Sequence, residues 1–124
     1  MAKESEFTQI VVQRLPDAGL LVRMKSSRLI HEETVTKIHD ELLTLVAPER
    51  LLLLDLTNIV TLGSAFLGVL IKTQKKLRSV MGSMSICGMR PSFEELFRIT
   101  RLDKRFEIYP DLESALRDSD ADLV

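Results

Sequence analysis

The period of the apolar positions changes along the chain, and the amino-terminal part predicts a hairpin followed by a helix. Two apolar runs, FTQIVVQRL and GLLVRMK, flank the turn-forming stretch PDAG. They predict antiparallel strands over residues 7–14 and 20–25, with a short extended piece at 28–30. From Glu32 to Pro48 the period is helical, and one face carries Val35, Ile38, Leu42 and Leu45.

The rest of the chain alternates strand and helix patterns. The run RLLLLDLTNI predicts a central strand covered on both faces, because it is continuously apolar and lies between two helical patterns. Helical patterns follow over residues 64–79, in RPSFEELFRITRL and in PDLESALRDS, where Asp111 is placed to cap the helix. The runs SMSICGM and FEIY between them predict further strands. We expect one core that contains Leu42, Leu45, Leu52, Leu54, Phe93 and Phe97.

This order of elements predicts an α/β fold. A hairpin followed by alternating helices and strands gives a mixed, mostly parallel β-sheet with about four helices. We expect a single domain over residues 1–124, with a core over about 7–118 and frayed ends. In such sheets function gathers in the loops that follow the carboxyl ends of strands, and residues 57–64 form one of these loops.

Composition and charge narrow the function classes. Apolar residues make up 45% and charged residues 28% of the 124 residues, and the net charge is −1. Such a chain has no global attraction for nucleic acid or an anionic membrane, and its apolar runs are too short for membrane insertion. We read the cations at Lys72, Lys75, Lys76 and Arg78 as the solvated side of a helix. The start MAKESEFTQ lacks a signal-peptide core, so we expect a cytoplasmic protein.

A search for catalytic or metal-binding residues gives no candidate. The single cysteine, Cys87, excludes an internal disulfide or a multi-cysteine metal site, and we expect it to pack as a small apolar residue. His31 and His39 follow no metal-binding spacing. The stretch GSAFLG lacks the lysine of a phosphate-binding loop, and it does not match the serine elbow of hydrolases. We therefore predict no enzyme activity, metal or cofactor.

The predicted helix over residues 64–79 offers a binding surface instead. Its first half, AFLGVLI, is apolar nearly all round, so it must be buried or must meet a partner, and burial is the favoured interpretation. Gly68 costs up to about 1 kcal/mol inside a helix, and a close approach of another backbone would explain it. Ser64 is either an N-cap or a modification site, and the two roles are compatible.

Most of the chain resembles the STAS domain, in particular the bacterial anti-sigma-factor antagonists. The resemblance is carried by the stretch LLLLDLTNIVTLGSAFLGVLIKTQKKLRSVMGSMSICGMRPSFEELFRITRLDKRFEIYPDLESAL. The resemblance implies a small mixed sheet with helices packed on it. The family's loop typically reads Asp-Ser-Ser-Gly-Leu-Gly, and Ser64 falls on its phosphorylated position. Leu67 and Gly68 match the end of that motif, whereas Gly63 replaces the acidic residue and Phe66 replaces a glycine.

The resemblance implies a regulator that binds an anti-sigma factor, itself a serine kinase of the histidine-kinase-like ATPase fold. Phosphorylation of Ser64 would switch that binding. The residues expected to contact the partner surround this serine: Thr61, Gly63, Ala65, Phe66, Leu67 and Gly68.

The alternative is a STAS adaptor or scaffold without phosphorylation, a subunit of a signalling assembly or of a lipid transporter. Gly63 and Phe66, the two departures from the family's motif, favour this alternative. The sequence leaves the identity of the partner and the oligomeric state open.

Overall fold

The main sheet is mixed and has five strands in the order β1-β2-β4-β6-β7. The computed structural model describes residues 7–16 and 19–122. β1 and β2 are antiparallel, as the hairpin prediction requires, and the remaining pairs are parallel. The PDAG turn lies partly outside the described residues. The strands are β1 (Ile10–Arg14), β2 (Leu20–Met24), β4 (Leu51–Asp55), β6 (Ser83–Cys87) and β7 (Glu107–Tyr109).

The four α-helices occur where the sequence predicts them, but the first ends at Leu43, before the predicted Leu45, and the third ends at Ile99 and is followed by a short 3₁₀ helix that was not predicted. Asp111 caps the last one as predicted, since its Oδ1 accepts a hydrogen bond from the Ser114 N–H at 2.8 Å. That helix continues to Asp122, further into the acidic tail than expected. No helix within the described ranges is long and apolar enough to cross a membrane. The helices are α1 (Glu32–Leu43), α2 (Ser64–Ser79), α3 (Pro91–Ile99), the short 3₁₀ helix η3 (Leu102–Lys104) and α4 (Leu112–Asp122).

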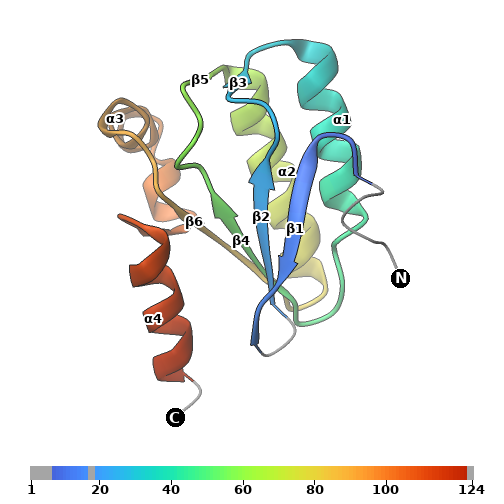
Figure 1. Ribbon diagram of the computed structural model, residues 1–124, viewed down its shortest axis with the longest axis vertical. Helices are drawn as coiled ribbons and strands as arrows, with labels where there is room; N and C mark the ends of the chain where they lie inside the picture. The colour runs from blue at the N-terminus through green and yellow to red at the C-terminus, as the bar shows by residue number, and fades with distance from the viewer. Residues whose placement is uncertain (1–6, 17–18, 123–124) are drawn as a thin grey trace.

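The sheet separates two apolar clusters. β4 lies at its centre and alternates, so that Leu52 and Leu54 face α1 and α2 whereas Leu53 faces α4. Figure 1 shows α1 and α2 together and α4 apart from them, on the other side of the sheet. The larger cluster contains all six residues predicted to share a core: Leu42, Leu45, Leu52, Leu54, Phe93 and Phe97.

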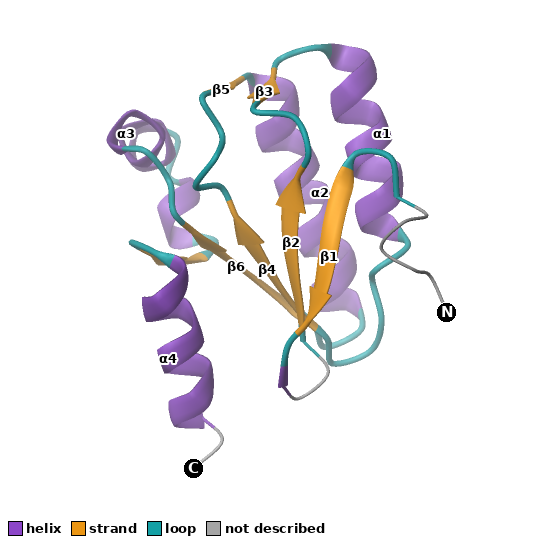
Figure 2. Cartoon of the chain, in the orientation of Figure 1, coloured by secondary structure: helices purple, strands orange, loops and turns teal. Residues whose placement is uncertain are grey.

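A second, two-stranded sheet lies beyond the ends of the main strands. β3 (Arg28–Leu29) pairs in parallel with β5 (Thr61–Leu62), and Figure 2 shows the pair next to the beginning of α2. The sequence predicts the extended piece at β3 but not its partner. This small sheet joins the segment that leaves β2 to the segment that leads into α2.

Candidate functional site

Ser64 is the first residue of α2, and its side chain is exposed to solvent. Its hydroxyl makes no hydrogen bond to any residue that the structure describes. The N-cap position belongs to Gly63, whose backbone is extended (φ −114°, ψ 175°) and which provides no capping side chain. The prediction of a helix that begins at residue 64 is therefore confirmed, whereas the interpretation of Ser64 as an N-cap is wrong.

The surroundings of Ser64 favour negative charge. A helix start leaves its first backbone N–H groups without partners inside the helix, and it carries partial positive charge. The first turn of α2 contains no acidic residue that would neutralise this charge. A phosphoryl group on the Ser64 oxygen would thus meet a favourable local field without any unfolding of the helix.

The loop that leads to Ser64 is anchored where β4 ends. Asp55 Oδ1 accepts hydrogen bonds from the backbone N–H of Thr57, at 3.0 Å, and from its hydroxyl. Asp55 Oδ2 forms an ion pair with Arg23 Nε at 3.0 Å. Burial raises the pKa of Asp55, but the hydrogen bonds from Thr57 and the charge of Arg23 outweigh burial and hold this pKa below its usual value.

Three further hydrogen bonds fix the rest of this loop. The Val60 N–H donates to Ser27 O at 2.7 Å, and the Gly63 N–H donates to Leu29 O at 3.0 Å. From the other side, Arg90 Nε donates to Ile59 O at 2.9 Å. The loop thus presents Ser64 at a defined place, beyond the carboxyl ends of the parallel strands.

The structure divides the predicted contact residues into two groups. Ala65 is exposed, and Thr61, Gly63 and Gly68 are half-buried. Phe66 and Leu67 are buried, with 0% and 8% of their surface exposed. Their assignment to partner contacts is corrected, because both side chains point into the core and attach α2 to the sheet.

Gly68 also differs from its prediction. A Cβ added to it would meet no atom within 4 Å, so no backbone approaches closely there. The glycine opens a gap on the outer surface of the helix.

Two exposed apolar residues border the segments that form the small sheet, and sequence reasoning missed both. Ile30 and Val60 each expose 47% of their surface. A Cβ placed on Gly63 would lie 3.9 Å from the Cα and Cγ2 atoms of Ile30, so Ile30 borders the helix start directly. No sequence signal separated these residues from neighbouring strand positions, because their exposure follows from the pairing of β3 with β5.

The described residues contain no candidate metal centre. Over residues 7–16 and 19–122, no group of three or more such side chains could hold a metal ion. Cys87 is buried as expected, and burial followed by the nearby charge of Asp55 raises the pKa of its thiol to about 12.

Comparison with known proteins identifies the fold and the family. The family model of the STAS domain matches residues 9–115. An anti-sigma-factor antagonist (STAS) domain protein from Planctomyces limnophilus superposes with a TM-score of 0.80 at 22% identity, over 90% of this chain and 97% of that one. No curated protein sequence matches the chain.

Two further structures are similar. An anti-sigma factor antagonist from Mycobacterium paratuberculosis has a TM-score of 0.74 and 27% identity, over 88% of this chain and 91% of that one. The Bacillus cell fate determinant SpoIIAA, in its phosphorylated form, has a TM-score of 0.63 and 14% identity, over 87% of this chain and 97% of that one.

Proposed function

Because this chain belongs to the STAS domain family, we propose that it is a non-catalytic regulator that binds an anti-sigma factor and is switched by phosphorylation of Ser64. The observation that carries the proposal is the position of Ser64, exposed at the start of α2 on a loop anchored from three sides. The likeness to anti-sigma factor antagonists supports the type of partner. We propose that this partner is a serine kinase of the histidine-kinase-like ATPase fold.

In the proposed switch, the kinase transfers the γ-phosphoryl group of ATP to Ser64. The bond between the serine oxygen and phosphorus forms, the bond to ADP breaks, and the hydroxyl proton leaves to a base on the kinase or to water. The phosphoryl group adds about −1.5 to −2 charge at the helix start, which the exposed side chain of Ile30 borders. A partner that covers Ser64 and Ile30 must desolvate that charge, and each 1.4 kcal/mol lost weakens binding about tenfold.

One observation supports the alternative, an adaptor or scaffold that is not phosphorylated. Gly63 provides no carboxylate next to Ser64, where the family's motif has one. Phe66 no longer favours this alternative, because it is buried and leaves the surface around Ser64 free. An aspartate fits the extended backbone at position 63, and its Cβ would have no neighbour closer than 3.9 Å.

Phosphorylation of the full chain by candidate kinase-type anti-sigma factors tests the proposal. The protein is incubated with each kinase and ATP, and intact mass and site mapping are measured. We expect one phosphoryl group on the wild type, none on Ser64→Ala, and one on Ser79→Ala, the matched control at the exposed far end of α2. We also expect the phosphorylated protein and Ser64→Asp to bind that kinase more weakly than the wild type.

Two outcomes would favour the alternative function, an adaptor or scaffold that is not phosphorylated. A kinase active on another substrate could leave both the wild type and Gly63→Asp unmodified. The partner could also bind Ser64→Asp as tightly as the wild type, which would place the interface elsewhere.

A further inference from the structure

The outer face of α2 forms one continuous exposed strip that begins at Ser64. Residues three or four positions apart share a helix face, and seven of the nine exposed or half-buried positions of α2 lie on one face, the other two being Ile71 and Arg78. The first part of the strip is small and neutral, and Gly68 leaves open space in it. The second part is cationic. In order, the strip consists of Ser64, Ala65, Gly68, Lys72, Lys75, Lys76 and Ser79.

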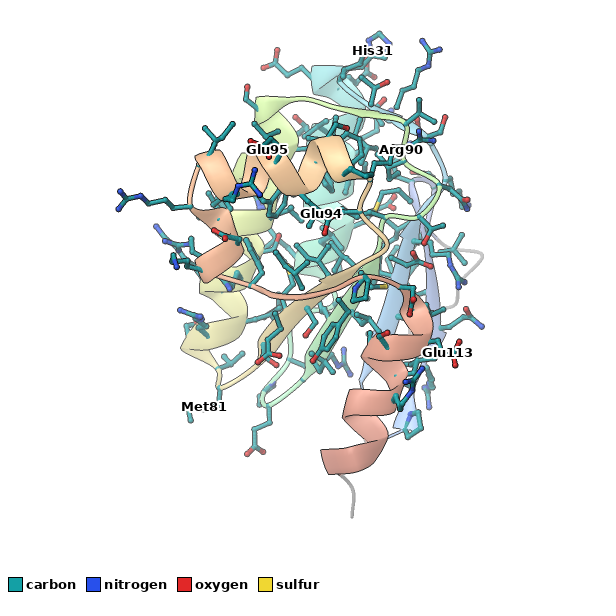
Figure 3. The ribbon with its side chains drawn as sticks, turned by 90° about the vertical axis from the view of Figure 1, so that its left-hand side faces the viewer. His31, Met81, Arg90, Glu94, Glu95 and Glu113 are labelled. Carbon is teal, nitrogen blue, oxygen red and sulfur yellow. The ribbon has the colours of Figure 1, made fainter. Side chains whose placement is uncertain are left out.

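The turn after α3 adds cations beside this helix. The Gln74 side-chain amide and the Arg78 guanidinium both donate hydrogen bonds to the backbone oxygen of Arg105. These bonds hold the turn against the second half of α2. In Figure 3 nitrogen-tipped side chains project from the edge of the molecule where α2 and this turn lie. We call the following residues the cationic face: Lys72, Lys75, Lys76, Arg101, Lys104 and Arg105.

The charge of this face is not neutralised within the described part of the chain. All six side chains are exposed, and none forms an ion pair there. The chain as a whole is strongly asymmetric, since residues 72–105 contain nine of its 17 Lys and Arg but only three of its 18 Asp and Glu. In a nearly neutral protein, the segment 72–105 is thus positive and the remainder of the chain is negative, and Asp103 is the acidic residue that lies among the cations of the turn.

We propose that the cationic face binds an acidic surface of the protein partner that contacts Ser64. This inference rests on the proposed function and adds the chemistry of the partner. Contact along one helix face would place the partner over Ser64 and over Lys72 and Lys75 at once. The cations attract an acidic surface, whereas a phosphoryl group at the neutral end of the strip repels it. The same acidic surface would therefore make binding sensitive to phosphorylation and to salt.

An acidic protein fits this surface better than nucleic acid or a membrane does. Duplex DNA and anionic bilayers present negative charge over an extended area, and they would also meet the negative remainder of the chain. A protein can confine its acidic side chains to the strip. Figure 3 shows Met81, which follows α2, well below His31 and Arg90 in the view. The strip runs along α2 from Ser64 to Ser79.

A titration with a labelled polyglutamate peptide tests the face without knowledge of the partner. The full chain is titrated at low salt, and backbone amide NMR shifts locate the binding site. We expect shifts in the second half of α2 and in residues 101–105. Lys72→Ala/Lys75→Ala should weaken binding about three- to tenfold. The matched control Lys37→Ala/Arg117→Ala also removes two exposed cations and should bind like the wild type.

The opposite results overturn the inference. Equal binding by both double variants, or no binding, would show that the face does not select acidic protein. Tighter binding of a 20-base-pair duplex or of phosphatidylglycerol vesicles, lost in Lys72→Ala/Lys75→Ala, would assign the face to those polyanions.

The same variants separate this inference from the proposed function. A kinase that phosphorylates Ser64 should bind Lys72→Ala/Lys75→Ala about three- to tenfold more weakly than the wild type. Equal binding would reject the cationic face and leave the Ser64 switch intact. If no kinase modifies Ser64, the proposed function fails, and the peptide titration alone decides on the face.

Discussion

Asp55 anchors the loop before Ser64 to the sheet through the hydrogen bonds that it accepts from Thr57 and its ion pair with Arg23. The stability that these contacts provide should depend on pH, because they need an ionised carboxylate. Its pKa is lowered in the folded protein, so its contribution to stability is present above the unfolded pKa and is lost as pH falls through the folded pKa. We predict that Asp55→Asn lowers the free energy of unfolding by about 1–3 kcal/mol at neutral pH, and by less at acid pH. Urea unfolding at about pH 7 and pH 3 measures this. An equal loss at both values would contradict the role of the charge.

Gly68 and Gly88 should respond to alanine in opposite directions. Gly68 lies in mid-helix with open space around its Cα, so Gly68→Ala should raise the free energy of unfolding by about 0.5–1 kcal/mol. Gly88 has a positive φ of 75°, and a Cβ there would collide with Thr57 and Asp55. We therefore expect Gly88→Ala to destabilise the protein. Thermal unfolding of the two variants checks both signs, and a loss of stability in Gly68→Ala would mean that the helix surface is not open.

At the scale of elements, the position of Ser64 at the start of α2 means that substitutions there should change partner binding without destabilising the fold. Ser64 caps nothing, so Ser64→Ala should change stability by less than about 0.5 kcal/mol. Ser64→Asp adds a negative charge at the positive end of α2 and should stabilise the protein by about 0.3–1 kcal/mol. Both variants are compared with the wild type by thermal unfolding at low salt. A clear drop in the melting temperature of Ser64→Asp would mean that the hydroxyl is held by contacts that the structure does not show.

The sequence predicts α2 much better than it predicts the small sheet next to it. Helix Ser64–Ser79 is found with the predicted bounds, because its 16 residues give a long helical pattern and a glycine stands before its start. The pair β3–β5 contains two residues in each strand, too few for a periodic signal. Its pairing depends on where β2 and β4 place their ends. The exposure of Ile30 and Val60 could not be predicted for the same reason.

For the whole molecule, the sequence predicts the layers but not every contact between them. The continuous apolar run of β4 indicates burial on both faces, and both clusters exist. In the first half of α2, however, apolar residues surround the helix, so periodicity alone cannot say which side faces the core. The expectation that Phe66 contacts the partner therefore fails, whereas the favoured burial of this half of the helix agrees with its fully buried side chain. The Arg23–Asp55 pair was missed as well, because it depends on the register between β2 and β4.

The packing of α4 on the sheet can be tested through Cys87, which lies in the smaller apolar cluster between them. Burial, with the charge of Asp55, raises the pKa of its thiol to about 12, so little reactive thiolate is present near neutral pH. Ala115 on α4 is 2% exposed in the same cluster, and Ala115→Glu would force a charge into it. We predict that this variant increases the rate of thiol labelling at least about tenfold, because α4 separates from the sheet while the larger cluster keeps the protein folded.

The matched control for this labelling experiment is Glu113→Ala, at an exposed position of α4 that pairs only with Arg117 in the described part of the chain. It should label as slowly as the wild type. Labelling is followed with a chromogenic disulfide reagent, and circular dichroism checks that the fold is retained. Rapid labelling of the wild type would mean that α4 does not cover Cys87. An unchanged rate in Ala115→Glu would mean that the helix stays docked in spite of the buried charge, and the two layers would then be coupled more tightly than their separate clusters indicate.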